Sequence, residues 1–288
     1  MKPTSNPSLD SLHLYARQWG MSALPFTTEL GEEGWLETAT IQRASQLFEQ
    51  TTQLRGVMLL AGTNGSGKST LVGRWLRQLE ERLFYPLALT HASLTGSSIL
   101  ASLTLKLGKP AGLRRERNLV AIEQALAELE RRTLVVVLDE AQNYSHGALE
   151  EIRLLLGLNL PQRPAFALVL VGDDYLLGTL RLRHHRALFS RISCHYQLQP
   201  WSRAEIADYL EKSLAAVGIT RPVYEPAAVE LLAAACAGLP RSLQILARTA
   251  WIEASAHKAQ LVLADHVQKA IDQVPHTPGK QINPQELP

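Results

Sequence analysis

The sequence predicts an α/β fold, in which a parallel sheet is flanked by helices and followed by a small domain made only of helices. Short apolar runs alternate with stretches of helical periodicity between residues 41 and 198. Such alternation is typical of parallel sheets covered on both faces. After Pro200 only helical signals follow. A glycine-rich segment, residues 62–69, separates the first apolar run from the next helix, as in α/β folds that bind anions.

The predicted strands are short apolar runs, as buried parallel strands are. They are expected at residues 56–61, 84–89, 133–138, 165–171 and 193–198. The predicted helices have apolar residues three and four positions apart. They are expected around residues 41–48, 71–79, 99–107, 119–129 and 149–155, and after Ser202, Glu225, Pro240 and Asp265.

Four segments are expected along the chain. The proline-rich end is predicted to be flexible, because it lacks the apolar residues of a packed element. The segments are a mixed leader at 1–36, the α/β domain at 37–199, a helical lid domain at 200–273 and a flexible tail at 274–288.

Composition excludes several classes of protein. The 288 residues carry a net charge of only +2, so this is not a polycation whose whole surface binds nucleic acid. Cys194 and Cys236 form no CxxC pattern, and no histidine cluster accompanies them, so no zinc site is expected. Without a signal peptide or an apolar run near the roughly 20 residues of a membrane helix, a cytoplasmic protein without membrane contact is expected.

The glycine-rich segment is a complete GxxxxGK[ST] pattern. Its glycines let backbone N–H groups turn around a phosphate without a Cβ clash. Lys68 can reach the β- and γ-phosphates, and Ser69 can offer its hydroxyl to Mg²⁺. A chance match is the alternative, and the flanking strand and helix argue against it. The predicted ATP-binding residues are Gly62, Thr63, Asn64, Gly65, Ser66, Gly67, Lys68, Ser69 and Thr70.

A second motif ends the third predicted strand, where Asp139 and Glu140 follow a wholly apolar run. A metal-bound triphosphate needs one carboxylate for the ion and another for the attacking water. Asp139 would hold Mg²⁺, directly or through water, and Glu140 would polarise the nucleophile. The alternative is a strand that ends in an acidic turn.

Two arginines are candidates for contacts with the γ-phosphate. Arg191 precedes the last strand and could reach the nucleotide of a neighbouring subunit. Arg241 begins a helix after Gly238-Leu239-Pro240 and could couple nucleotide state to domain angle. For both, the alternative is a solvated arginine.

Basic residues gather in two places. Either cluster could contact a phosphate backbone, and a solvated helix face is the alternative. The second cluster contains Arg181, Arg183, His184, His185 and Arg186. The first contains Lys106 and the four predicted DNA contacts Lys109, Arg114, Arg115 and Arg117.

The order of these motifs resembles that of the AAA+ ATPases over roughly residues 35–273. Leu24-Pro25-Phe26, the string Asp139-Glu140-Ala141-Gln142 and the Gly-x-Pro-Arg turn are similar to the ExeA-like branch. This branch includes the secretion ATPase ExeA/GspA and DNA-transposition regulators of the TnsC, TniB and MuB type. The resemblance implies ATP and Mg²⁺ bound by Lys68 and Ser69, Asp139 and Glu140 as the Walker B pair, Arg191 as arginine finger and Arg241 as sensor 2.

Asp173 ends the fourth predicted strand, at the position where such ATPases carry the polar residue of sensor 1. It departs from the usual Gln, Asn or Thr, and a carboxylate there would repel the γ-phosphate unless Mg²⁺ or water intervened. The alternative is that Asp173 or Asp174 caps the following helix. Both interpretations stay open.

Within the branch, the lack of a membrane segment favours the transposition regulators, because secretion members carry a transmembrane helix after the ATPase part. The resemblance then implies a homo-oligomer, helical or ring-shaped, on double-stranded DNA. Its other partners would be a DDE transposase and a target-selection protein, and ATP would be hydrolysed to ADP and phosphate between subunits. The alternatives are a cytoplasmic ExeA-like ATPase acting on protein, and an initiator- or loader-type AAA+ protein.

Overall fold

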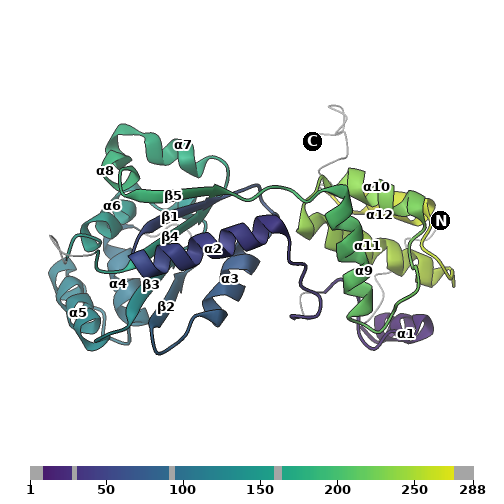
Figure 1. Cartoon of the computed structure of the whole chain (residues 1–288), viewed down its shortest axis with the longest axis horizontal. Coiled ribbons are helices and arrows are strands. Elements are labelled where there is room, and N and C mark those ends of the chain that lie inside the picture. Colours follow the sequence, from purple (N-terminus) through teal and green to yellow (C-terminus); the bar gives the residue numbers. More distant parts are fainter. Residues whose placement is uncertain (1–8, 28–30, 91–94, 159–163, 276–288) are drawn as a thin grey trace. The chain divides into compact units, whose positions relative to one another are not determined.

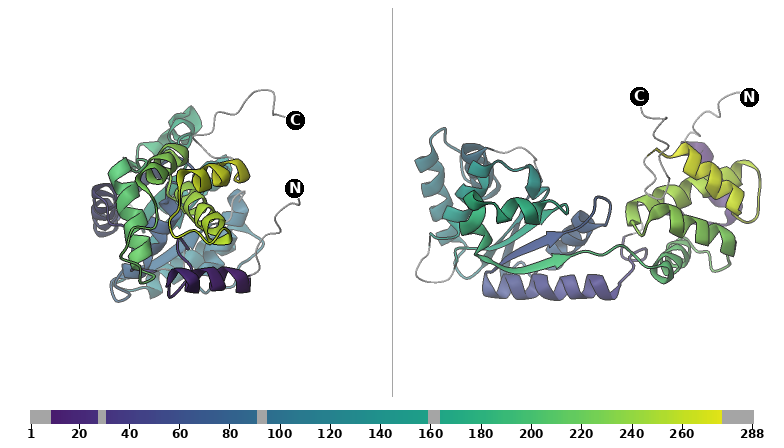
Figure 2. Two further views of the ribbon diagram at one scale, coloured as in Figure 1. Left: turned by 90° about the vertical axis from the view of Figure 1, so that its right-hand side faces the viewer. Right: turned by 90° about the horizontal axis from the view of Figure 1, so that it is seen from above.

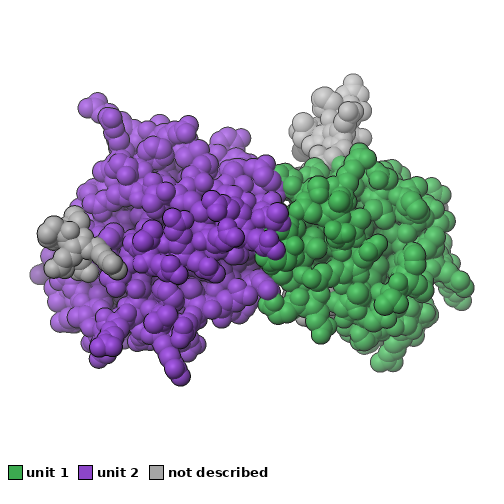
Figure 3. Space-filling view, in the orientation of Figure 1, with its two compact units in different colours: residues 1–38, 200–288 green, residues 39–199 purple. Residues whose placement is uncertain are grey.

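The protein consists of two compact units. The structure, a computed structural model, describes residues 9–27, 31–90, 95–158 and 164–275. Residues 39–199 form an α/β unit, and residues 1–38 together with 200–288 form a helical unit (Figure 3). In the described part of the chain, no helix is both long and apolar enough to cross a membrane.

The α/β unit is built on a five-stranded parallel sheet with the order β2-β3-β4-β1-β5 (Figure 1). The predicted parallel sheet is therefore confirmed, and the strand limits differ from the expected ones by no more than two residues. The bounds are β1 Val57–Ala61, β2 Phe84–Leu89, β3 Thr133–Leu138, β4 Ala167–Gly172 and β5 Ile192–Gln197.

The register brings the carboxyl ends of the strands to one edge. Ala61, the last residue of β1, pairs with Gly172 of β4 on one side and with Gln197 of β5 on the other. Leu138, which ends β3, pairs with Leu170 of β4. The loops after β1, β3 and β4 therefore begin beside one another.

Helices cover both faces of this sheet, because right-handed crossovers in the two directions along it fall on opposite sides. Helices α2 and α3 lie together, and the rings of Phe48 and Trp75 stack with centroids 4.4 Å apart. The other helices pack on alternate strand residues such as Leu59 and Val136. The helices are α2 Ala39–Leu54, α3 Lys68–Gln78, α4 Gly96–Lys106, α5 Arg115–Glu128, η2 Ala141–Asn143, α6 His146–Leu155, α7 Leu176–Arg181, η3 Arg183–His185 and α8 Arg186–Phe189.

The helical unit brings residues 9–27 together with the helices after residue 200 (Figure 2), and these segments share one apolar core. Helix α1 packs against α11, and Trp19 Nε1 donates a hydrogen bond to Ser255 Oγ at 2.8 Å. This differs from the predicted organisation, in which residues 1–36 form a leader of their own. The reason is that Trp19, Met21 and Phe26 bury their side chains among helices that lie about 200 residues later. The helices are α1 Leu9–Trp19, α9 Arg203–Ala215, α10 Pro226–Cys236, α11 Pro240–Ala256 and α12 Ala264–Gln273.

Several predicted helix starts are confirmed, and one is wrong. Ser202 and Glu205 form a capping box at the start of α9, and Pro226 and Pro240 occupy first positions of α10 and α11. The last helix was expected after Asp265, but α12 already begins at Ala264. Asp265 instead lies in the first turn, where a carboxylate interacts favourably with the helix dipole.

Candidate functional site

The glycine-rich segment forms a tight loop between β1 and α3. Gly65 and Gly67 have φ angles of 88° and 94°, a left-handed conformation that costs other residues about 1–2 kcal/mol. A Cβ atom on Gly62 would lie 3.1 Å from Leu198 O and 3.1 Å from Ser66 Oγ. Two glycines are thus needed for the turn and one for close packing, and the first-turn N–H groups of α3 are left without intrahelical acceptors.

Lys68 begins α3 and is largely buried under this loop. Its Nζ donates hydrogen bonds to Gly62 O at 2.6 Å and to Thr63 O at 3.2 Å. Burial lowers the pKa of Lys68, while four carboxylates, in the order Glu140, Asp139, Asp174 and Asp173, act in the opposite direction. One ammonium group therefore faces four carboxylates, and this excess of negative charge suits a hard divalent cation.

The Walker-B-like motif makes a sharp turn directly after β3. Asp139 N donates to Leu89 O at 3.0 Å, and Glu140 N donates to Asp139 Oδ1 at 2.9 Å. Glu140 has a φ of 52°, which is rare for a residue with a side chain and tends to mark functional sites. The Tyr144 hydroxyl also donates a hydrogen bond to Leu89 O, at 3.0 Å, and so connects the segment after the turn to the end of β2. Burial, with a smaller effect of Asp139, raises the pKa of Tyr144 to about 12.

Gln142 joins the two acidic strand ends, a role that the sequence did not reveal. Its Nε2 donates to Glu140 Oε2 at 2.7 Å, and its Oε1 accepts a hydrogen bond from Asp173 N at 3.4 Å. The residue lies in η2, two positions after Glu140. Its amide therefore fixes the orientation of the Glu140 carboxylate. The only signal in the sequence was its place in the Asp139-to-Gln142 string.

The two adjacent aspartates after β4 have different partners. Asp173 Oδ1 accepts hydrogen bonds from Tyr175 N at 3.0 Å and Leu176 N at 3.2 Å, and so caps the turn that leads into α7, whose N-cap residue is Tyr175. Asp174 accepts one hydrogen bond from Thr63 Oγ1 at 3.1 Å and another from Gln197 Nε2. Asp173 thus supports the capping interpretation, whereas Asp174 connects the glycine loop to β5.

These residues fit a magnesium-bound nucleoside triphosphate. The Ser66 hydroxyl is buried, and among the described residues it has no hydrogen-bond partner. Ser69 is exposed in the first turn of α3, after β1, and Asp139 follows β3, which β4 separates from β1 in the sheet. A hydroxyl and a carboxylate are oxygen ligands of the kind that Mg²⁺ takes. The loop, Lys68 and the strand-end carboxylates together could hold the phosphates and the ion.

Residues 51–180 match the family model of the AAA domain. A curated relative, general secretion pathway protein A of Aeromonas hydrophila, is 31% identical over 226 residues, which are 76% of this chain. The chain spans only 41% of that relative. The sequence likeness to the ExeA/GspA proteins is therefore confirmed for an AAA domain that carries the phosphate loop and both acidic strand ends.

Solved structures show the same fold. The ORC2 protein of Aeropyrum pernix has a TM-score of 0.67 at 19% identity and covers 92% of this chain, with 75% of that protein covered. Cdc6p of Pyrobaculum aerophilum has a TM-score of 0.65 at 17% identity, covering 88% of this chain and 70% of its own. The ORC1 protein of Aeropyrum pernix, solved in complex with DNA, has a TM-score of 0.62 at 21% identity, with coverage of 88% and 66%. These likenesses confirm the predicted fold class, a parallel sheet flanked by helices with a helical region after it.

The two predicted arginines lie in different units. Arg191, between α8 and β5, is half-buried, and its Nη1 donates to Arg153 O at 3.0 Å near the end of α6. Arg241 is exposed in the first turn of α11 in the helical unit. The turn before it requires Gly238, because a Cβ there would lie 2.5 Å from Trp201 O. The roles of both arginines stay predictions.

The four predicted DNA contacts divide into two pairs. Lys109 Nζ lies 2.5 Å from Glu128 Oε1, and Arg115 makes a bidentate contact with Glu151 at 2.6 and 2.8 Å. Arg114 and Arg117 are exposed. Two of the four cations are thus neutralised by carboxylates of their own AAA domain, which the sequence pattern did not predict.

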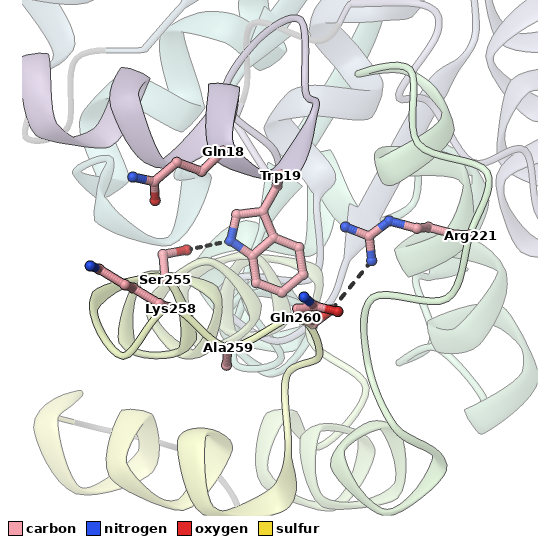
Figure 4. Close-up of a pocket in the computed structure, with 7 residues that line it drawn as sticks. All are labelled: Gln18, Trp19, Arg221, Ser255, Lys258, Ala259 and Gln260. Carbon is pink, nitrogen blue, oxygen red and sulfur yellow. Dashed lines mark hydrogen bonds between the residues drawn. The ribbon is translucent and has the colours of Figure 1, made fainter.

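The helical unit contains a separate pocket of about 650 Å³ beside Trp19 (Figure 4). Arg221 lies over the indole, with its Cζ 5.4 Å from the ring centroid, and its Nη1 donates to Gln260 O at 3.3 Å. Sequence reasoning missed this pocket, because its walls come from both ends of the chain. The lining residues are Gln18, Trp19, Arg221, Ser255, Lys258, Ala259 and Gln260.

Proposed function

We propose that this protein is a magnesium-dependent ATPase that hydrolyses ATP to ADP and phosphate. The observation that carries the proposal is the meeting of Lys68 with Asp139 and Glu140 at one edge of the sheet. The carboxylates act on the Lys68 ammonium, so the phosphate-binding and water-activating groups share one site. The match of residues 51–180 to the AAA domain supports the same conclusion.

The phosphate loop and the first turn of α3 would bind the triphosphate. Backbone N–H groups of residues 62–70 surround the phosphates, and Lys68 exchanges its two carbonyl acceptors for phosphate oxygens. Ser69 and Asp139 would hold Mg²⁺, which neutralises charge on the β- and γ-phosphates when it is bound. Asp174 supports the loop from the side through Thr63.

Glu140 would orient the attacking water and polarise its O–H bond. Gln142 keeps the Glu140 carboxylate in place through the 2.7 Å hydrogen bond. The Asp173 backbone N–H is part of the same network, so Asp173 would sense the γ-phosphate through Gln142 and not through direct contact. Arg191 of a neighbouring copy would complete the site as arginine finger, and Arg241 would act as sensor 2.

We further propose that ATP controls assembly of the protein on double-stranded DNA, in a cytoplasmic regulator of DNA transposition. A homo-oligomer would link a DDE transposase to a target-selection protein. Three features support this: the motif resemblance, the DNA complex of the similarly folded ORC1 protein, and the exposed Arg114 and Arg117. The second candidate is an ATPase that acts on an assembly of proteins, which the 31% identity to general secretion pathway protein A favours.

One experiment separates these functions. The wild-type protein and Glu140→Gln are imaged by negative stain with ATP and Mg²⁺, in the presence and absence of long duplex DNA. Filaments or rings that need both ATP and DNA, and persist longer in Glu140→Gln, are expected for the DNA regulator. ATP-dependent oligomers that ignore DNA would favour the protein-assembly ATPase. Phosphate release at the same rate in both proteins would contradict the assignment of the catalytic site itself.

A further inference from the structure

Three histidines from distant parts of the sequence meet on the α/β unit. His146 is the first residue of α6, and His184 and His185 end the short helix η3. The ring centroids lie 4.6 Å apart for His146 and His184, 4.8 Å for His146 and His185, and 4.3 Å for His184 and His185. Sequence spacing did not indicate this group of histidines, which forms because folding brings α6 and η3 together.

Each of the three rings has a nitrogen close to nitrogens of the other two. One nitrogen of each imidazole lies within 4.8 Å of the others. Tetrahedral Zn²⁺ with ligand bonds of 2.0–2.1 Å needs nitrogens about 3.3 Å apart, so modest side-chain rotations would bring them into range. His185 is buried, whereas His146 and His184 are exposed. A fixed inner ligand with two adjustable outer ligands leaves a fourth position for water.

The charged groups near the cluster are mostly basic, since Arg183 and Arg186 flank His184 and His185, so an ion there would be held by nitrogen ligands and not by carboxylates. Glu150, one turn along α6, is the nearby carboxylate that acts on His146 and His185, although Arg153 holds it in a bidentate contact at 2.6 and 2.8 Å. A neutral imidazole offers the lone pair that a metal needs. Among the described residues, no hydrogen bond joins any of the three rings to another group.

We propose that His146, His184 and His185 bind one divalent transition-metal ion, with Zn²⁺ as the best fit, and that the ion joins η3 to the start of α6. Imidazole ligands suit zinc and its neighbours in the first transition row, and three histidines with an open fourth position are a known zinc arrangement. The site is distinct from the magnesium site, because its ligands are nitrogens and lie on other elements. Edge-to-face packing of the rings without an ion is the competing explanation.

The proposed ion would connect two segments that hold Arg191. Helix η3 continues directly into α8, which ends two residues before Arg191, and α6 carries Arg153, whose carbonyl oxygen accepts the Arg191 hydrogen bond. The ion would therefore link the segment that contains Arg191 to α6, the helix to which Arg191 is hydrogen-bonded. This consequence rests on the proposed role of Arg191, whereas ion binding itself does not.

Titration of the untagged, metal-free full chain with Co²⁺ tests the site. Excess Mg²⁺ is present to occupy the carboxylate site, and no nucleotide is added. Saturable visible absorption of four-coordinate cobalt at one ion per chain, displaced by Zn²⁺, is expected. His146→Ala and His184→Ala should each weaken binding at least tenfold, and His195→Ala, a matched exposed histidine of the same unit, should not change it.

Two readouts keep the result interpretable. Circular dichroism and binding of a fluorescent ATP analogue show that the variants fold, and both should match the wild type because the replaced side chains are exposed. Equal cobalt binding by wild type, His146→Ala and His184→Ala, or no saturable binding by a folded wild type, would overturn the proposal. A wild type that binds cobalt but hydrolyses no ATP would leave the metal site standing and contradict the proposed function.

Discussion

The α/β unit contains one cluster of carboxylates and one of basic residues, and the two differ in how far other residues compensate their charge. At the carboxyl edge of the sheet, four carboxylates act on the single ammonium of Lys68. In the segment between α4 and the start of α5, Lys109 and Arg115 are paired with Glu128 and Glu151. The first cluster keeps an excess of negative charge. In the second, ion pairs with Glu128 and Glu151 offset part of the positive charge.

This difference teaches how a charge cluster relates to a ligand. A surface ion pair contributes little stability, about 0–1 kcal/mol, but it removes a cation from the set that can meet an incoming phosphate. A group of carboxylates without compensating cations near a glycine loop destabilises the folded protein through mutual repulsion, unless a cation binds among them. The first cluster therefore indicates a ligand site more strongly than the second.

Replacing Lys68 with Ala should have the largest effect on the acidic edge. ATP affinity should fall at least about 100-fold, because charge-assisted hydrogen bonds contribute about 1.5–3 kcal/mol each. Binding of a fluorescent ATP analogue measures this, with the exposed Lys106→Ala as the control. Near-normal ATP affinity in Lys68→Ala would contradict the conclusion that the acidic cluster around Lys68 indicates a ligand site.

Glu140→Gln should leave ATP binding in place and slow hydrolysis. A drop of about 100-fold in phosphate release is expected, as for loss of a general base. Single-turnover kinetics with saturating ATP measure it, since weaker binding then does not contribute. A normal rate would show that Glu140 contributes only charge to the acidic edge.

Gln142→Ala should slow hydrolysis about tenfold through loss of positioning. The variant removes the 2.7 Å hydrogen bond to Glu140 while Glu140 itself remains. Asn143→Ala, an exposed change in the same 3₁₀ turn, is the matched control. The turnover number should fall in Gln142→Ala with little change in KM. Equal rates in both variants would exclude a positioning role for Gln142.

The basic cluster should separate into two functional pairs. Arg114→Ala with Arg117→Ala should weaken duplex binding several-fold and lower its salt dependence, because exposed arginines can release DNA counterions. Lys109→Ala with Arg115→Ala should change duplex binding less. Fluorescence anisotropy at two salt concentrations measures both. If Lys109→Ala with Arg115→Ala loses more duplex affinity than the other double variant, the ion pairs with Glu128 and Glu151 do not keep these two residues from contacting DNA.

The two aspartates after β4 should show the smallest effects. Asp173→Ala should lower the free energy of unfolding by about 1 kcal/mol, since a capping carboxylate is lost, and Asp173→Asn should restore most of it. Urea unfolding measures the change. Asp174→Asn serves as the comparison. This change should alter the KM for ATP, because Asp174 accepts a hydrogen bond from Thr63 of the glycine loop. A large loss of hydrolysis in Asp173→Asn would favour direct sensing of the γ-phosphate.

The strands, the glycine loop and the Asp139-Glu140 turn could be predicted from the sequence, because each depends on residues close together in the chain. Runs such as Thr133–Leu138 indicate buried strands without knowledge of their neighbours. The contacts of Asp174 could not be predicted, since they need the strand order that places β1 between β4 and β5. The same holds for Gln142, whose two partners lie on loops after different strands.

The sequence by itself determined the fold class and predicted the chemistry of a nucleotide site, through local periodicity and a motif of eight residues. Tertiary structure alone decided which charges stay available, which aspartate supports the loop, and that His146 meets His184 and His185. It also placed Trp19 against Ser255, 236 positions later. The physical reason is that side-chain pairing depends on the register and packing of whole elements, and composition near a residue does not encode its distant partner.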